Sequence, residues 1–239
     1  MKIGVIVFPG TWSDRDCGGV VESLGDQGAE LTYLWHRDRD LKGSDCVIVP
    51  GGFSYGDHLR AGAIAATSPI MSSVTEFASA GGLVWGICNG FQILCEAGLL
   101  PGALVPNDVL EFRCMWTHLV CERADTPFTR NLEPGRVVSI PISHNEGCYL
   151  ADAATLSRLE QNGQVVFRYC DQVGRVRPGA NPNGSAHGIA GIVNQAGNVL
   201  GMMPHPERAS DLLLGGADGR LMFESVLRAN RKPAPVHQP

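Results

Sequence analysis

Residues 83–93 read LVWGICNGFQI, an apolar run that leads into Cys88 between two glycines. A short apolar run that ends at glycine is typical of a buried strand, and the residues after Cys88 favour a helix. The pattern Gly-x-Cys-x-Gly is that of a nucleophile elbow, in which small neighbours let a strand turn sharply into a helix and push the central side chain outward. By itself, this stretch favours equally a reactive thiol and a buried structural cysteine at position 88.

Similar apolar runs recur along the chain and alternate with helical segments in its first half. Strands are expected at 3–8, 46–49, 83–87, 137–140, 165–169 and 189–193, and helices at 16–27, 61–80, 90–97 and 221–227. Strands that alternate with helices indicate a mostly parallel sheet covered on both faces. We therefore predict an α/β fold, with an open, mostly parallel sheet between helices and a mixed or antiparallel extension from the second half.

The composition is that of an ordinary globular protein, with 44% hydrophobic and 18% charged residues among 239. The net charge of −5 is spread along the chain without a block of lysine and arginine, so we expect no nucleic-acid partner. The apolar stretch near the start is too short for a signal peptide or a membrane span, which predicts a cytoplasmic protein with no membrane contact. We expect one domain over residues 1–228 and a disordered, proline-rich tail over 229–239.

The eight cysteines are scattered along the chain, and several lie inside apolar runs. No two of them have the C-x-x-C spacing of a structural zinc site. We therefore predict that most are reduced and buried, and that this chain binds no metal.

A second segment with residue types suited to catalysis reads PHPE at 204–207 and places His205 two residues before Glu207. In an extended backbone, which Pro206 favours, residues two apart project from the same face. A carboxylate beside an imidazole fixes its tautomer and stabilises its charged form, as a general base serving a thiol requires. Without Cys88, a polar surface loop would be the simpler interpretation, but together the two segments predict a set of Cys88, His205 and Glu207.

Two more segments follow expected strands, at the sheet edge where sites of such folds lie. Gly51 and Gly52 allow positive φ, so a backbone N–H from their loop could face Cys88 as half of an oxyanion hole. A phosphate-binding loop is the alternative, but the pattern G-x-x-x-x-G-K-[ST] is absent from the chain. His144 competes with His205 for the role of base, and its segment is interpreted either as a structural loop or as part of a substrate pocket.

Three motifs, PGGFSYGD at 50–57, GICNGFQ at 86–92 and MPHPER at 203–208, together resemble the class I, triad-type glutamine amidotransferase family. Further stretches, such as FPGTWSDRD, ISHNEGCY and NPNGSAHGIAGIVNQAGNVLG, are most similar to the glutaminase subunits of phosphoribosylformylglycinamidine synthase. The resemblance covers most of residues 3–228 and implies a flavodoxin-like glutaminase domain over 1–228.

The resemblance also implies roles for individual residues. Cys88 would attack the side-chain amide of glutamine, His205 would carry protons and Glu207 would orient His205. The oxyanion would meet backbone N–H groups from the elbow and the glycine loop: Gly52, Phe53 and Asn89. The residues expected to line the glutamine pocket are Gln92, His144 and Gly147.

By the same resemblance, glutamine would be hydrolysed through a thioester and the ammonia would pass to a large synthetase subunit. That subunit would use ATP and Mg²⁺ to convert formylglycinamide ribonucleotide to its amidine, with a small third subunit in the complex. This chain would then need no cofactor, which fits its lack of a phosphate-binding loop.

Other interpretations remain open, namely a glutaminase subunit of another pathway, a cysteine hydrolase or stress-response protein of similar fold, and a non-catalytic scaffold. Hydrolases of that kind usually take their histidine from beside the elbow, where this chain has Asn89. The chain departs from the resembled family in PGTWSD at 9–14, where PGSNCD is usual, and in HNEGCY at 144–149, where HGEGRY is usual. Both departures spare the Cys/His/Glu set, and we expect them to affect glutamine affinity or docking.

Overall fold

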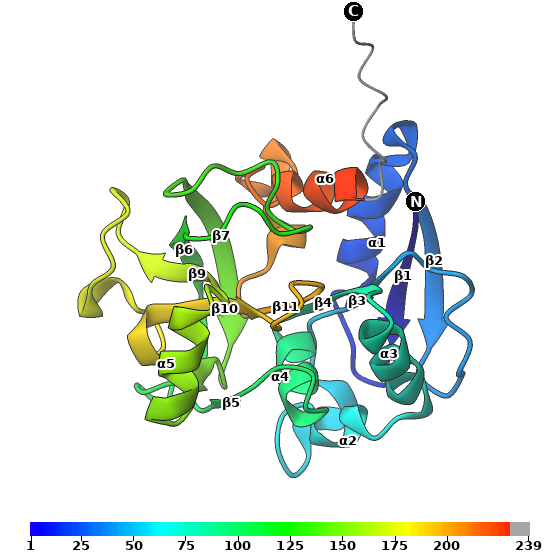
Figure 1. Cartoon of the computed structure of the whole chain (residues 1–239), viewed down its shortest axis with the longest axis horizontal. Helices are drawn as coiled ribbons and strands as arrows, with labels where there is room; N and C mark the ends of the chain where they lie inside the picture. The colour runs from blue at the N-terminus through cyan, green and yellow to red at the C-terminus, as the bar shows by residue number, and fades with distance from the viewer. Residues whose placement is uncertain (230–239) are drawn as a thin grey trace, which may run out of the picture.

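A nine-stranded sheet runs through the computed structural model, which describes residues 1–229 (Figure 1). Its parallel half consists, in spatial order, of β2 (Glu30–Trp35), β1 (Lys2–Val7), β3 (Cys46–Val49), β4 (Leu83–Ile87) and β11 (Val199–Met202). Antiparallel pairing then adds β10 (Ile189–Val193), β9 (Val165–Cys170), β6 (Arg113–Cys121) and β7 (Val137–His144). The predicted parallel sheet with an antiparallel extension is confirmed, and the strand order of the parallel half is flavodoxin-like.

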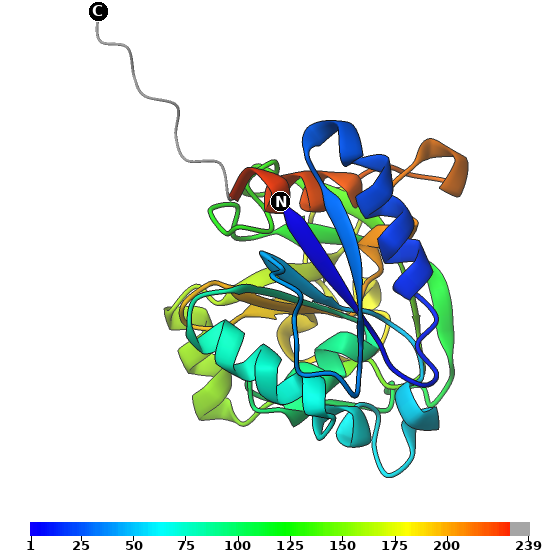
Figure 2. The same ribbon diagram turned by 90° about the vertical axis from the view of Figure 1, so that its right-hand side faces the viewer.

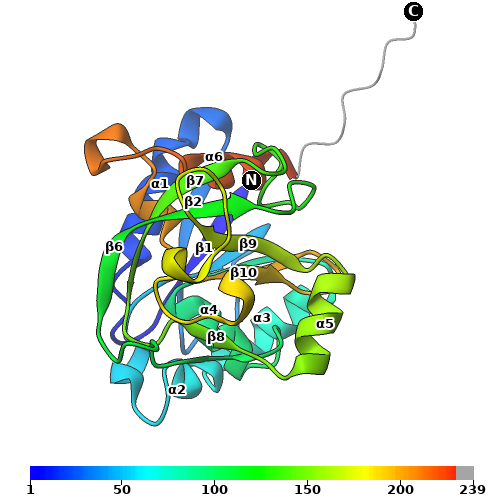
Figure 3. The same cartoon turned by 90° about the vertical axis from the view of Figure 1, so that its left-hand side faces the viewer.

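Helices cover both faces of the parallel half, as the sequence predicts (Figure 2). One face carries α1 (Asp14–Ser23) and α6 (Arg220–Ala229), and the other carries α2 (Ala63–Ala66), α3 (Pro69–Ser79) and α4 (Asn89–Glu96). At the antiparallel end lies α5 (Ala153–Gln161) (Figure 3). A separate two-stranded sheet pairs β5 (Ala103–Val105) with β8 (Cys148–Leu150).

Strand β4 is almost completely buried, and its successive residues point to opposite faces of the sheet. Trp85 is fully buried and packs against Phe223 of α6, with 4.8 Å between the ring centroids. Its neighbour Gly86 lies against α4, where an added Cβ would come within 2.7 Å of the carbonyl oxygen of Gly90. The backbones of β4 and α4 therefore touch directly, which brings the start of α4 tightly against the end of the strand.

The structure corrects two expected helices and part of the expected tail. The helix expected at 16–27 ends at Ser23, and Gly25–Gln27 form a separate turn of 3₁₀-helix. Residues 61–80 do not form one helix: Ser68 is extended (φ −66°, ψ 148°) and Pro69 begins a new helix. Proline restricts the residue before it to extended conformations and lacks the N–H that a continuing helix needs. Ala229, expected in the disordered tail, belongs to α6, whereas the rest of that expected tail, 230–239, lies outside the described residues.

The remaining expectations about environment can be compared with residues 1–229. None of the helices in this range is long and apolar enough to cross a membrane. Most of the eight cysteines are buried, as expected, although Cys114 is exposed and Cys95 is half-buried. Over the same range, no group of three or more histidine, cysteine, aspartate or glutamate side chains could hold a metal ion.

Candidate functional site

Cys88 lies in the sharp turn between β4 and α4 that the sequence predicts. Its backbone has φ 51° and ψ −107°, a conformation that residues other than glycine rarely adopt and that is often found at functional sites. Its N–H donates to the carbonyl oxygen of Met202 at 2.7 Å, which ties the turn to β11. An added Cβ on Gly90 would lie 1.8 Å from the carbonyl oxygen of Val49, so only glycine permits this approach of α4 to β3.

His205 and Glu207 follow β11 and form a close pair in the interior. His205 Nδ1 lies 2.6 Å from Glu207 Oε1, and both side chains are almost completely buried. The expected extended backbone is wrong, because Pro206–Arg208 form a turn of 3₁₀-helix. The predicted side-chain pairing nevertheless occurs, since this turn also directs both side chains to one side.

Gly51 marks the point where Cys88 and His205 meet. An added Cβ on Gly51 would lie 2.7 Å from His205 Cε1 and 3.4 Å from Cys88 Cβ. Because Nδ1 of His205 is occupied by Glu207, the interaction of the ring with Cys88 falls to Nε2. The structure thus brings Cys88 together with His205 and Glu207, which lie more than a hundred positions further along the sequence.

The charge of His205 is set by opposing effects. Burial favours the neutral ring, but the charge of Glu207, followed by that of Cys88, outweighs it and raises the pKa of His205 from 6.5 to about 10. The protonated ring is therefore the favoured form near neutral pH.

The glycine loop supplies one free backbone donor beside Cys88. The N–H of Phe53 donates to the carbonyl oxygen of Gly10 at 3.0 Å and is therefore occupied. The N–H of Gly52 has no acceptor among the described residues, and that of Asn89 opens α4, where the first amides lack intrahelical partners. Of the three expected oxyanion donors, Gly52 and Asn89 are available, and Phe53 is not.

A cavity of about 180 Å³ opens over Cys88. Its described walls come from the glycine loop (Gly52, Phe53, Asp57), from Gln92 of α4 and from residues 143–146. Gln92 and His144, both expected in a substrate pocket, therefore line it. Gly147 is not part of the wall and lies behind it, where an added Cβ would come 2.2 Å from His144 Cε1.

His144 differs from His205 in its electrostatic environment. Burial and the positive charge of His205 lower its pKa to about 3, so the ring is neutral. Its Nδ1 lies 3.1 Å from Asn107 Oδ1, and Asn183 lies beside Nε2 at 3.5 Å. Held between two amides, His144 is suited to shaping the cavity wall rather than to serving as the base.

Sequence reasoning did not identify the hydrogen bonds between polar side chains that tie the cavity together. Asn89 donates from Nδ2 to Asp57 Oδ1 at 3.2 Å and to Gln92 Oε1 at 2.8 Å, and its Oδ1 accepts from the N–H of Ser54 at 3.1 Å. Gln92 Nε2 donates to the carbonyl oxygen of Glu146 at 2.6 Å. Asp57 and Glu146 lie within PGGFSYGD and HNEGCY, but neither has a role assigned from the sequence, so only the fold reveals their place at this cavity.

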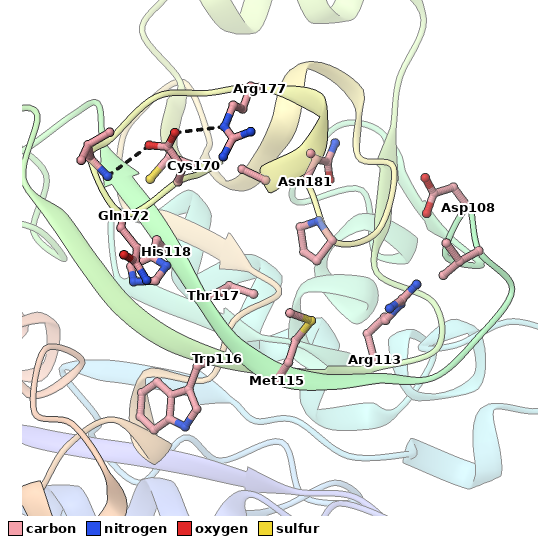
Figure 4. Close-up of a pocket in the computed structure, with 16 residues that line it drawn as sticks. Asp108, Arg113, Met115, Trp116, Thr117, His118, Cys170, Gln172, Arg177 and Asn181 are labelled. Atoms are coloured by element: carbon pink, nitrogen blue, oxygen red, sulfur yellow. Dashed lines mark hydrogen bonds and ion pairs between the residues drawn. The ribbon is translucent and has the colours of Figure 1, made fainter.

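Two larger hollows lie away from the thiol. One of about 650 Å³ lies between β6 and the segment 170–182, where Arg113, Met115 and His118 line it and Asp171 pairs with Arg177 at 3.0 Å (Figure 4). The other, of about 660 Å³, borders Glu207 on the side of α1. Cys88 lines neither of them, so cavity size does not identify the reacting site in this molecule.

Comparisons with known proteins identify the family of this chain. Residues 1–215 match the model of the CobB/CobQ-like glutamine amidotransferase domain. The phosphoribosylformylglycinamidine synthase subunit PurQ of Moorella thermoacetica is 59% identical over 227 residues, which cover 95% of each chain. That of Gloeobacter violaceus is 58% identical over 227 residues, or 95% of this chain and 97% of the relative.

Solved structures give the same result. A chain in the structure of PurLQS from Thermotoga maritima matches with a TM-score of 0.84 and 42% identity, covering 96% of this chain and 99% of that one. The glutaminase domain of CTPS from Trypanosoma brucei, solved with bound acivicin, shares the fold with a TM-score of 0.60 at 13% identity, covering 98% of this chain and 96% of that domain. The resemblance inferred from the motifs is therefore confirmed, and the chain belongs to the PurQ family of phosphoribosylformylglycinamidine synthase subunits, which are glutamine amidotransferases.

Proposed function

We propose that this chain hydrolyses L-glutamine to glutamate and ammonia through a thioester on Cys88, and that it delivers the ammonia to a synthetase partner. The partner would use ATP and Mg²⁺ to convert formylglycinamide ribonucleotide to formylglycinamidine ribonucleotide in de novo purine biosynthesis, while this chain holds no cofactor. The observation that carries the proposal is the buried pair of His205 and Glu207, which leaves Nε2 of the ring to interact with Cys88 at the strained elbow.

The reaction follows from this geometry. The sulfur of Cys88 attacks the carbonyl carbon of the glutamine side-chain amide, and its proton resides on Nε2 of His205. The N–H groups of Gly52 and Asn89 stabilise the oxyanion of the tetrahedral intermediate. Protonated His205 then donates its proton to the leaving nitrogen, so that ammonia departs and a γ-glutamyl thioester remains.

Water completes the cycle. His205, now neutral, accepts a proton from a water molecule that attacks the thioester carbonyl carbon. The carbon–sulfur bond breaks, glutamate leaves, and the proton returns to the Cys88–His205 pair. Glu207 stabilises the charged ring at each stage without itself taking the proton.

The surface around the cavity supports docking of a partner. Trp12, Phe53 and Phe112 are 39%, 43% and 48% exposed, and their rings stack in sequence with centroids 6.4 Å apart. Exposed aromatic side chains grouped at one place mark interaction surfaces. We propose that the large synthetase subunit covers this rim, and that a small third subunit completes the complex.

The decisive experiment is Cys88→Ala in the reconstituted complex. We expect glutamine-dependent amidine formation to fall by about 10³-fold or more, as when a catalytic nucleophile is removed, while activity with added ammonia remains. Cys95→Ala and Cys121→Ala serve as controls and should retain most of the glutamine-dependent activity, because neither residue lines the cavity. Full glutamine-dependent activity of Cys88→Ala would refute the proposal.

A further inference from the structure

Two carboxylates stand at the cavity that contains Cys88. Asp57 and Glu146 both line it, and each is partly exposed. Neither forms an ion pair with any residue in the range 1–229, and the described cavity wall includes no lysine or arginine. The one histidine in the wall, His144, is neutral because its pKa is about 3. The cavity therefore carries negative charge without a counter-ion from its own wall.

The segments that carry these carboxylates are tied to the helix that follows the thiol. Asn89, the residue after Cys88, holds Asp57 at 3.2 Å, and Gln92 holds the backbone of Glu146 at 2.6 Å. Both ties come from the first turn of α4, which also fixes the elbow. A molecule bound to the carboxylates is consequently held in the same cavity as the sulfur.

The segment that carries Asp57 has an unusual backbone. Asp57 has φ 52° and Tyr55 has φ 54°, values in the left-handed region that are uncommon for residues other than glycine. Such conformations persist where the surrounding structure enforces them, often at ligand sites. Burial and the charge of Glu146 raise the pKa of Asp57 to about 6, so the two carboxylates repel each other in the absence of a cation.

We infer that Asp57 and Glu146 bind the α-ammonium group of glutamine and so select an α-amino acid among carboxamides. The inference rests on the proposed hydrolysis of glutamine at Cys88. A short aliphatic chain separates the reacting amide of glutamine from its ammonium group, so a substrate whose amide meets the sulfur can place its cation at the wall. The free Oδ2 of Asp57 and the Glu146 carboxylate, which accept no hydrogen bond from residues 1–229, supply the acceptors.

The test compares glutamine with glutaramate, which has the same chain and amide but lacks the α-amino group, in the reconstituted complex. Asp57→Asn and Glu146→Gln should each raise KM for glutamine by about 10- to 100-fold, the range of a charge-assisted hydrogen bond. Their kcat/KM for glutaramate should match that of the wild type. Asp26→Asn, which alters an exposed carboxylate of the turn Gly25–Gln27, is the control and should change neither.

Each outcome has a defined meaning. Equal losses with glutamine and glutaramate would assign the carboxylates a structural role and overturn the inference, as would unchanged KM in both variants. If Asp57→Asn fails to fold, Glu146→Gln decides, because its side chain makes no hydrogen bond with the described residues. If the wild-type complex shows no hydrolysis that depends on Cys88, the proposed function itself fails, which is distinct from hydrolysis without ammonium selection.

Discussion

Glu207→Gln would remove the charge beside His205 while keeping the shape of the side chain. The two groups are almost fully buried and 2.6 Å apart, and Glu207 is the largest of the effects that raise the pKa of His205 to about 10. At about 1.4 kcal/mol per pKa unit, the roughly three units between pH 7 and the folded-state pKa of about 10 correspond to about 4 kcal/mol of stability near pH 7. Since Cys88 contributes part of this stabilisation, we expect the variant to lose about 3 kcal/mol of unfolding free energy, in line with the removal of one partner from a buried pair.

The sign of the pH dependence follows from the direction of the shift. The folded-state pKa of His205 lies above its unfolded value, so the stabilisation is complete below pH 6.5 and is lost as the pH rises to about 10. Urea unfolding at a series of pH values should therefore show the gap in unfolding free energy between wild type and variant narrowing across that range.

Catalysis gives a second measurement of the same contact. A loss of about 3 kcal/mol corresponds to a fall of about 10²-fold in kcat for glutamine hydrolysis by the reconstituted complex. The chain offers a matched control in His187 and Glu160, whose Nδ1 and Oε1 are 2.7 Å apart at an exposed site. Glu160→Gln should leave kcat unchanged. A Glu207→Gln variant with wild-type kcat and a wild-type pH profile of unfolding would refute the reasoning.

Two further predictions concern packing and the partner. Gly90→Ala should destabilise the fold by about 3 kcal/mol or more in urea unfolding, because its Cβ meets the backbone of Val49. Gly19→Ala, in α1 with no atom near its Cβ, should instead be neutral or stabilising by up to about 1 kcal/mol, and equal effects of the two changes would contradict the packing argument. The purified chain alone should hydrolyse glutamine slowly and accelerate when the synthetase subunit is added; rapid turnover without a partner would count against a site completed by docking.

Some strands could be predicted from the sequence because they are buried on both sides, and others could not. The apolar runs of β3, β4 and β10 coincide with the expected ranges. Strand β2, ELTYLW, escaped prediction because it lies at the sheet edge and most of its side chains are partly exposed. Strand β6, RCMWTHLVC, escaped for a similar reason, since its first half faces solvent and lacks an apolar pattern.

The site divides in the same way between local and long-range information. The elbow and the spacing of His205 and Glu207 are local patterns, so the sequence suffices to propose them. Their approach to each other depends on β4 and β11 being neighbours, which no local pattern shows. Asp57 is further removed from prediction, because it reaches the cavity only through the Asn89 side chain and a loop with positive φ.

The residues that depart from the family pattern lie at different places relative to the cavity. Trp12, in PGTWSD, stacks on Phe53 at the cavity rim. The guanidinium carbon of Arg208 lies over Trp12, 3.8 Å from the centre of the indole ring. Cys148, in HNEGCY, is buried behind the wall. Trp12 and Cys148 do not line the cavity, whereas Asn145, the other departure in HNEGCY, does. We therefore expect the Asn145 departure to act on glutamine affinity and the Trp12 departure, at the rim, to act on docking of the partner. A rim that differs from that of relatives requires a matching surface on the synthetase, so specificity between subunits can diverge while the reaction stays the same.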